Sequence, residues 1–155
     1  MSKQSRRLAG LLLVVFPTVI FGGVSLLRFL TDSSSGYVDN PLRQDLWRAG
    51  HAHAGVLLIL SLLALRYVDE AALSDGAKTF VRNSIPSAAI LLPVAFFLSV
   101  LPPDAREPNA LIYLAYLGGV VLAAGLLTLG VGLLRTGRAA GAAEEAPGAD
   151  AKQAA

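Results

Sequence analysis

Four long apolar runs alternate with three short polar loops along this chain. The runs cover residues 8–27, 49–65, 85–101 and 110–134, are 20, 17, 17 and 25 residues long, and contain no Asp, Glu, Lys or Arg. A helix needs about 17–25 residues to cross the hydrocarbon core of a bilayer, so each run is long enough. Within each run the residues are continuously apolar and do not alternate between apolar and polar, as the strands of a transmembrane barrel would. The pattern therefore excludes such a barrel. The pattern predicts an all-α, four-helix transmembrane bundle with up-down-up-down topology.

Helix-capping residues and prolines set the expected boundaries. We expect spans at about residues 8–30, 41–67, 84–102 and 109–135, within one domain of residues 1–138. The Ala/Gly-rich tail, residues 139–155, has too little apolar surface to order itself and is predicted to be disordered. Asn and Ser cap helices, proline is favoured in a first turn, and an internal proline bends a helix. The expected starts are Asn40-Pro41, Asn83 or Ser84, and Asn109, and the expected bends are at Pro17 and Pro93.

Basic residues are unequally divided between the two sides of the predicted membrane. Nine lie on the side of the N-terminus and four on the other side. The positive-inside rule therefore places both termini in the cytoplasm. We expect a multi-pass protein of a cell membrane, namely the bacterial cytoplasmic membrane, with the lipid bilayer as its first partner. Trp47, at the outer end of the second span, is expected to anchor at the headgroup level.

Composition excludes several functional classes. The chain has no cysteine, which excludes disulfides, thiolate metal ligands and cysteine nucleophiles. No basic cluster is interleaved with aromatic residues, so nucleic acid is not an expected partner. Within the spans no Ser-His-Asp arrangement, no paired catalytic carboxylates and no His-Glu-x-x-His helix can be assembled. The expected function is therefore non-enzymatic.

The clearest candidates for chemistry are His51 and His53, which lie in Gly-His-Ala-His-Ala-Gly at the outer end of the second span. Residues two apart on a helix point about 200° apart, so one metal ion cannot take both side chains. His53 lies on an apolar stripe of this helix and is predicted to pack against another span or to face lipid. His51 shares a stripe with Gln44 and Arg48 and is predicted to face an aqueous pocket or the outer loops.

Two interpretations of the histidines stay open. In the first, one or both bind haem iron, copper or a proton-carrying small molecule, since ionisable groups inside spans usually mark a function. In the second, they hydrogen-bond neighbouring helices or loop carbonyls, because a neutral imidazole is inexpensive to bury. Tyr113 and Tyr116, at a similar depth in the fourth span, could line a small pocket beside them or be ordinary interface tyrosines. Asp45 and Arg48, three residues apart, are placed to form a polar network.

The His51-Ala-His53 element resembles the His-x-His element of membrane proteins related to the haem–copper oxidase catalytic subunit. That resemblance implies haem or copper ligation. It covers about ten residues, and where those proteins commonly carry a glycine five residues after the second histidine, this chain has Leu58. The additional ligand histidines on separate helices are absent as well. The whole chain also resembles small bacterial four-span proteins with a Gly-His-Ala-His-Ala-Gly core, which implies the fold but no activity.

The fourth span is the richest in small residues. Ala115, Gly119 and Ala123 repeat every four residues, and Gly118, Gly125 and Gly132 repeat every seven, so small residues follow the helix faces. Such faces allow close helix contacts, and they predict a homo-oligomer or a membrane complex formed through this span. The sequence thus favours a structural or accessory membrane subunit. The alternatives are a haem- or copper-binding redox protein using His51 or His53, and a small oligomeric transporter.

Overall fold

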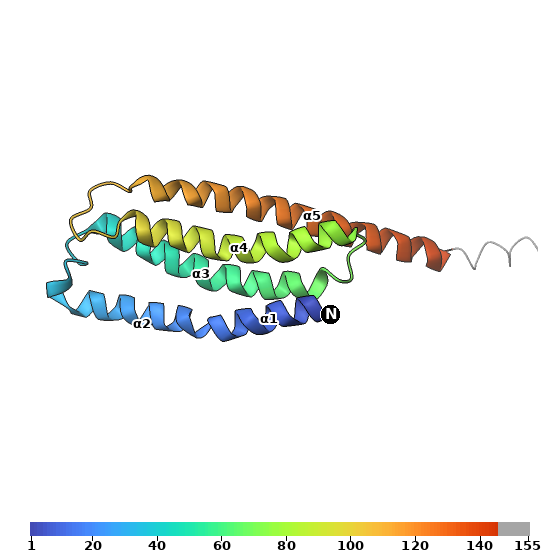
Figure 1. The fold of residues 1–155 in the computed structure, drawn as a ribbon, viewed down its shortest axis with the longest axis horizontal. Coiled ribbons are helices and arrows are strands. Elements are labelled where there is room, and N and C mark those ends of the chain that lie inside the picture. The colour runs from blue at the N-terminus through green and yellow to red at the C-terminus, as the bar shows by residue number, and fades with distance from the viewer. Residues whose placement is uncertain (146–155) are drawn as a thin grey trace, which may run out of the picture.

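The computed structural model describes residues 1–145, in which every secondary-structure element is a helix (Figure 1). The order is α1 (Lys3–Val15), α2 (Pro17–Thr31), the short 3-10 helix η1 (Ser33–Ser35), α3 (Pro41–Tyr67), α4 (Asp75–Ser99), the 3-10 helix η2 (Ala110–Ile112) and α5 (Tyr113–Glu145). Four segments are long and apolar enough to cross a membrane: Lys3–Thr31, Pro41–Tyr67, Asp75–Ser99 and Ala110–Arg138. The predicted all-α fold with four spans is confirmed, and the chain is a multi-pass membrane protein.

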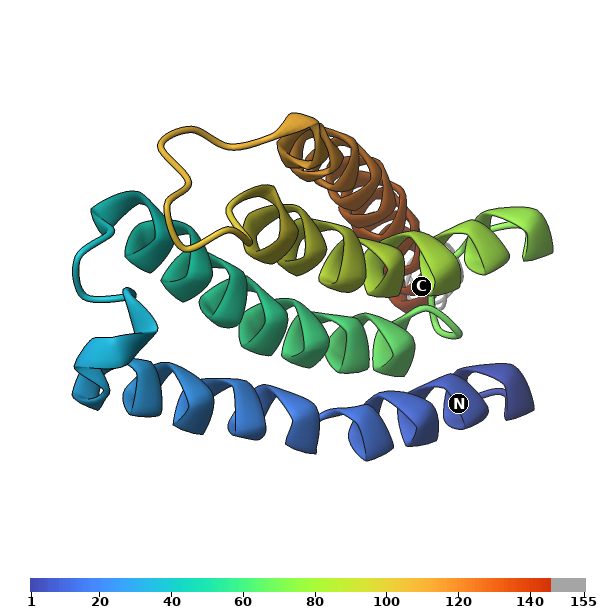
Figure 2. The ribbon, with the colours of Figure 1, turned by 60° about the vertical axis from the view of Figure 1, so that its left-hand side comes forward.

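The helices pack in the order α1–α2, α3, α4 and α5. Helix α4 packs against both α3 and α5, while α1 and α2 touch the rest of the bundle mainly through α3 (Figure 2). Half of the most apolar window of α4 is buried, against 6% in the first span. The chain begins at the end of the bundle where α5 finishes, so both lie on one side (Figure 1). We call this the N-terminal end; its assignment to the cytoplasm stays a prediction.

Two predicted starts are found, and at Pro17 the first span is interrupted instead of bent. The Asn40 side chain accepts a hydrogen bond from the Arg43 backbone N–H, and Pro41 is the first residue of α3. The first span is interrupted at Phe16, between α1 and α2, so that Pro17 opens a new helix instead of bending a continuous one. Asn109 accepts from the Leu111 N–H and thereby caps η2, which leads into α5.

The predicted start of the third span is wrong. Helix α4 begins at Asp75 instead of residue 84, and the capping side chain is Ser74, which accepts from the Ala77 N–H. It also ends at Ser99, before the expected residue 102. Residues 75–83 carry charges of both signs, so hydropathy alone does not mark them as helix. Their packing decides the matter, since Val81 and Arg82 are buried against neighbouring elements.

The fourth span also extends beyond expectation. Helix α5 continues to Glu145, so residues 139–145, which were expected to be disordered, are helical. Alanine has the highest helix propensity, which explains a helix in a segment with little apolar surface. The remainder of the predicted tail, residues 146–155, lies outside the described part of the chain.

Trp47 is not a lipid-facing anchor, which corrects the expectation from its position. It is 8% exposed and lies in an aromatic cluster with Phe29, Tyr37 and Phe97. Its Nε1–H donates to the Phe97 carbonyl at 3.1 Å, and the Arg43 guanidinium lies 4.1 Å from its ring centre. Trp47 therefore joins α2, α3 and α4 at the end of the bundle opposite the N-terminal end.

Candidate functional site

His51 lies against the glycine face of the first span. A Cβ atom placed on Gly23 would be 3.1 Å from both Cε1 and Nε2 of His51, and one on Gly22 would be 3.6 Å from Nδ1. The half-buried imidazole thus occupies the space that these two glycines leave open on α2. The prediction that His51 faces an aqueous pocket or the outer loops is wrong, because α2 covers that side of α3. The second span therefore packs on a small-residue side of the first span.

His53 faces the opposite side of α3, toward α4. Its ring centre lies 5.1 Å from that of Phe96. Its Nδ1 is 2.7 Å from the Ala49 carbonyl oxygen. Since a carbonyl only accepts, Nδ1 carries the hydrogen in this contact, which leaves Nε2 as the nitrogen that would offer a lone pair in a neutral ring. His53 packs against another span, as its apolar stripe predicts.

The two imidazoles are therefore separate sites. They project to different sides of one helix, as their spacing predicts, and no group of three or more His, Asp or Glu that could hold a metal occurs among the residues whose side chains the structure describes. A haem or copper bound here would depend on a single imidazole of this chain, completed by the cofactor itself or by another molecule.

Tyr113 and Tyr116 lie together but away from the histidines. Their ring centres are 6.1 Å apart at the start of α5, and the residues are 68% and 71% exposed. Helix α5 packs on α4, not on the face of α3 that carries His51. No hydrogen bond joins either tyrosine to a histidine in the described chain, so the structure does not assemble these residues into one pocket.

Asp45 and Arg48 are brought together, but only weakly. Arg48 Nη2 is 3.8 Å from Asp45 Oδ1, with side chains 55% and 79% exposed. The same guanidinium donates to the Gln44 side-chain oxygen at 2.7 Å. An exposed pair of this kind contributes at most about 1 kcal/mol to stability. This polar network is consequently a solvated helix surface.

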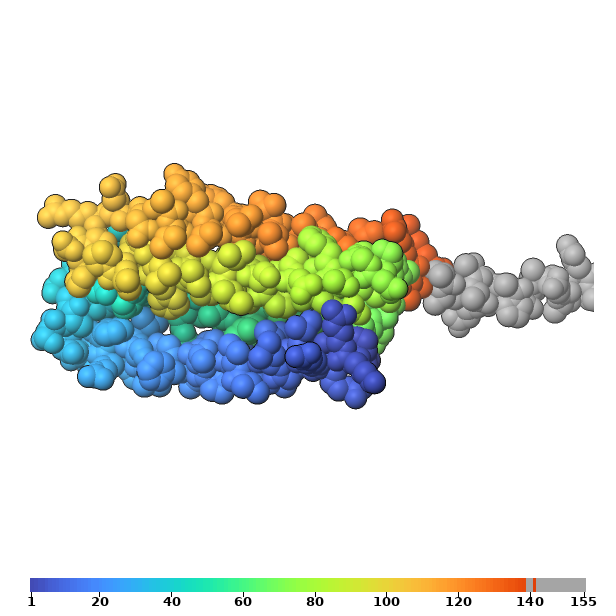
Figure 3. Space-filling model, in the orientation of Figure 1, coloured from blue at the N-terminus to red at the C-terminus, as the bar shows by residue number. Residues whose placement is uncertain are grey.

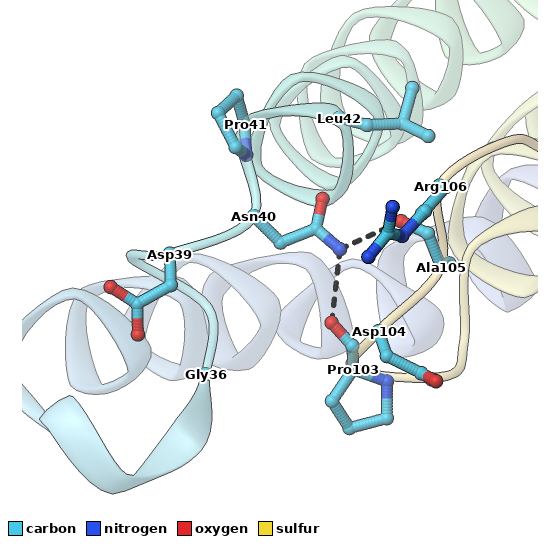
Figure 4. Close-up of a pocket in the computed structure, with 9 residues that line it drawn as sticks. All are labelled: Gly36, Asp39, Asn40, Pro41, Leu42, Pro103, Asp104, Ala105 and Arg106. Carbon is cyan, nitrogen blue, oxygen red and sulfur yellow. Dashed lines mark hydrogen bonds between the residues drawn. The ribbon is translucent and has the colours of Figure 1, made fainter.

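An open pocket lies at the same end, between the loop before α3 and the loop after α4 (Figure 4). Its volume is about 570 Å³. The Asn40 side-chain amide crosses it and donates to the carbonyls of Pro103, at 3.0 Å, and Ala105, at 2.9 Å. Asn40 thereby caps α3 and joins the two loops with a single side chain. This use of the residue fits a structural clamp better than a ligand site.

A buried polar cluster at the N-terminal end was not predicted. Arg82 on α4 and Asp69 in the loop after α3 form an ion pair at 2.6 Å, with side chains 8% and 16% exposed. The Ser2 backbone N–H donates to Asp69 Oδ2 at 2.6 Å, and Arg82 Nε donates to Ser5 Oγ at 3.0 Å. Burial pushes the pKa of Asp69 upward, but these hydrogen bonds to the carboxylate outweigh it and hold that pKa below its ordinary value. The cluster ties α1 to the rest of the bundle.

The sequence carries no signal for this cluster. Arg82 is a single arginine in a segment of mixed charge, which gives no indication that it is buried. Only the arrival of α1 beside α4 makes Arg82 an interior residue. No family model, curated protein or solved structure matches this chain.

Proposed function

We propose that this protein is a non-enzymatic membrane subunit that binds another transmembrane helix along an uncovered face of α5. Two glycine faces of α5 carry the argument. A Cβ on Gly118 or Gly125 would collide with α4, at Leu92 and at Ser84, so those positions serve packing within the chain. A Cβ on Gly119 or Gly130 would meet no atom within 4 Å. Residues 119 and 130 are eleven apart, which returns them to the same side of the helix.

Gly130 opens onto an apolar groove between α3 and α5. The groove has a volume of about 220 Å³ and is lined almost entirely by leucine, alanine and glycine, with Tyr67 at one end. In a bilayer, helices associate where small residues let backbones approach closely, because burial from lipid supplies little driving force. An uncovered glycine beside a groove is therefore suited to receive a partner helix, and this single observation carries the proposal.

The test is the assembly state after purification in mild detergent, compared with Gly130→Leu. The proposal expects the parent to purify with a defined partner or as an oligomer, and Gly130→Leu to lose that assembly without losing its fold. Gly10→Leu, on the opposite side of the bundle and equally free of neighbours, is the matched control and should retain the assembly. A parent that purifies as a lone monomer, or an assembly that survives Gly130→Leu, would refute the proposal.

A second candidate is a haem- or copper-binding protein that uses His53. The observation in its favour is the Nδ1 hydrogen bond to Ala49, because metal-ligating histidines almost always donate their other ring N–H and present the remaining nitrogen to the metal. Visible absorption and metal analysis of the purified protein test this. A Soret band or stoichiometric copper should disappear in His53→Ala and persist in His51→Ala; a parent with neither signal excludes this candidate.

A further inference from the structure

A second groove lies on the other side of the bundle, between α1 and α4. Two adjoining hollows, of about 570 Å³ and 200 Å³, share Leu8, Leu11 and Asn83 in their linings. Most of the remaining wall is apolar, with Val14 on α1, Ile90 on α4 and Leu58 of α3 at the floor, and the polar side chains lie mainly toward the N-terminal end of the bundle. Figure 3 shows α3 in the depression between α1–α2 and α4. The groove is thus open to the lipid side and closed beneath.

The N-terminal cluster explains why this groove exists. Ser2 and Ser5 fix the first turn of α1 to Asp69 and Arg82, while the next turns make few contacts with α4. A Cβ on Gly10 would meet no atom within 4 Å. Helix α1 is consequently held at its beginning and stands apart from α4 beyond it.

The mouth of the groove is cationic. Arg7 and Gln4 line it from α1, and Arg82 lines its inner part from α4. Among the residues whose side chains the structure describes (1–138 and 141) the ion pairs are Arg48–Asp45, Arg66–Glu70 and Arg82–Asp69, so Arg7 has no acidic partner among them. Lys3 and Arg6 lie in the neighbouring turns of α1 and add to the positive charge.

Measured along the helices, the groove is long enough for one leaflet and too short for the whole bilayer. On α1 its apolar part extends from Leu8 to Val15, eight residues or about 10 Å of helix, against about 15 Å for half of a hydrocarbon core. A transmembrane helix would need a groove across both leaflets. A lipid acyl chain needs one only, with its headgroup where the apolar walls end.

We propose that this groove binds one anionic phospholipid, with its phosphate at Arg7 and an acyl chain along Leu8, Leu11 and Ile90. Basic pockets between spans are suited to anionic headgroups, and each basic residue near the membrane surface strengthens such binding by about fivefold. The lipid fills the space that α1 leaves beside α4. This inference does not depend on the partner helix proposed for α5.

The experiment is a native mass-spectrometry titration of the full chain in detergent with phosphatidylglycerol and with phosphatidylcholine of the same acyl chains. The parent should bind phosphatidylglycerol at least fivefold more tightly. Arg7→Gln should remove most of that preference. Gly10→Leu, which places a side chain in the groove without a clash, should weaken binding of the anionic lipid to the level of phosphatidylcholine.

Matched controls separate a defined site from general charge. Arg6→Gln neutralises the adjacent arginine, which does not line the groove, and Gly130→Leu enlarges a glycine on the other side of the bundle; both should keep the preference. Equal binding of the two lipids by the parent, or unchanged preference in Arg7→Gln and Gly10→Leu, would overturn the proposal. Displacement of the lipid by glycerol phosphate alone would also overturn it, because it would indicate an anion site without an acyl-chain groove.

Discussion

Replacing Asp69 by alanine leaves the Arg82 guanidinium buried without its counter-charge. Arg82 would keep its hydrogen bond to Ser5 Oγ at 3.0 Å and a longer one to Gln4 at 3.4 Å, but would lose the 2.6 Å bond to the carboxylate. The Ser2 N–H would lose its acceptor in the same step. Both changes act at the contact that holds α1 against α4.

The structure indicates the size of the effect. Breaking a buried ion pair by removing one partner costs about 3–5 kcal/mol, because an uncompensated charge remains in a poorly hydrated place. Arg82 and Asp69 retain 8% and 16% exposure, which admits some water and favours the lower part of that range. We expect Asp69→Ala to lower the free energy of unfolding by about 3 kcal/mol, more than a hundredfold in the equilibrium constant.

The assay is equilibrium unfolding by SDS in mixed micelles, followed by fluorescence of Trp47, the single tryptophan. Glu70→Ala is the matched control, because it removes the neighbouring acid, whose pair with Arg66 has side chains 56% and 51% exposed. An exposed pair contributes about 0.2–1 kcal/mol, so the control should be mild. In Asp69→Ala combined with Arg82→Met, most of the loss should be recovered, since no buried charge is left.

The pH dependence gives an independent check with a definite sign. Because the folded-state pKa of Asp69 lies below its ordinary value of 3.8, its contribution is complete above that value and is lost as pH falls through and below it. The difference between the parent and Asp69→Ala should be constant above about pH 5 and shrink below about pH 4. Equal losses in Asp69→Ala and Glu70→Ala, or a difference independent of acid, would refute the reasoning.

Three further predictions follow from packing. The fluorescence of Trp47, which is 8% exposed, should be quenched only weakly by brominated lipids in reconstituted vesicles. Strong quenching would show that Trp47 faces lipid. Trp47→Phe should lower the free energy of unfolding by about 0.5–1.5 kcal/mol through loss of the hydrogen bond to the Phe97 carbonyl, measured by SDS unfolding with circular dichroism. Gly125→Ala should lower the free energy of unfolding by about 1–3 kcal/mol, because its Cβ would collide with Ser84. Gly119→Ala should be neutral or stabilising, because a Cβ there meets open space. The reverse order in the same unfolding assay would contradict the α4–α5 packing.

Local features of the sequence determined the spans and several of their limits. The length of each charge-free run fixes the number of spans, since the bilayer imposes a length and forbids unpaired backbone groups. Asn40 and Pro41 set the start of α3 because capping depends on a few adjacent residues. The opposite directions of His51 and His53 likewise follow from the helical period alone.

Tertiary structure decided what those side chains meet. His51 faces glycines of α2, Trp47 is covered by Tyr37 and Phe97, and Arg82 becomes an interior residue beside Asp69. None of these follows from hydropathy or periodicity, because each depends on which helix arrives from far along the chain and how closely. The sequence by itself determined that the chain crosses a bilayer four times; only the packing of the helices decided which polar groups are buried, since burial is a property of neighbours and not of a segment.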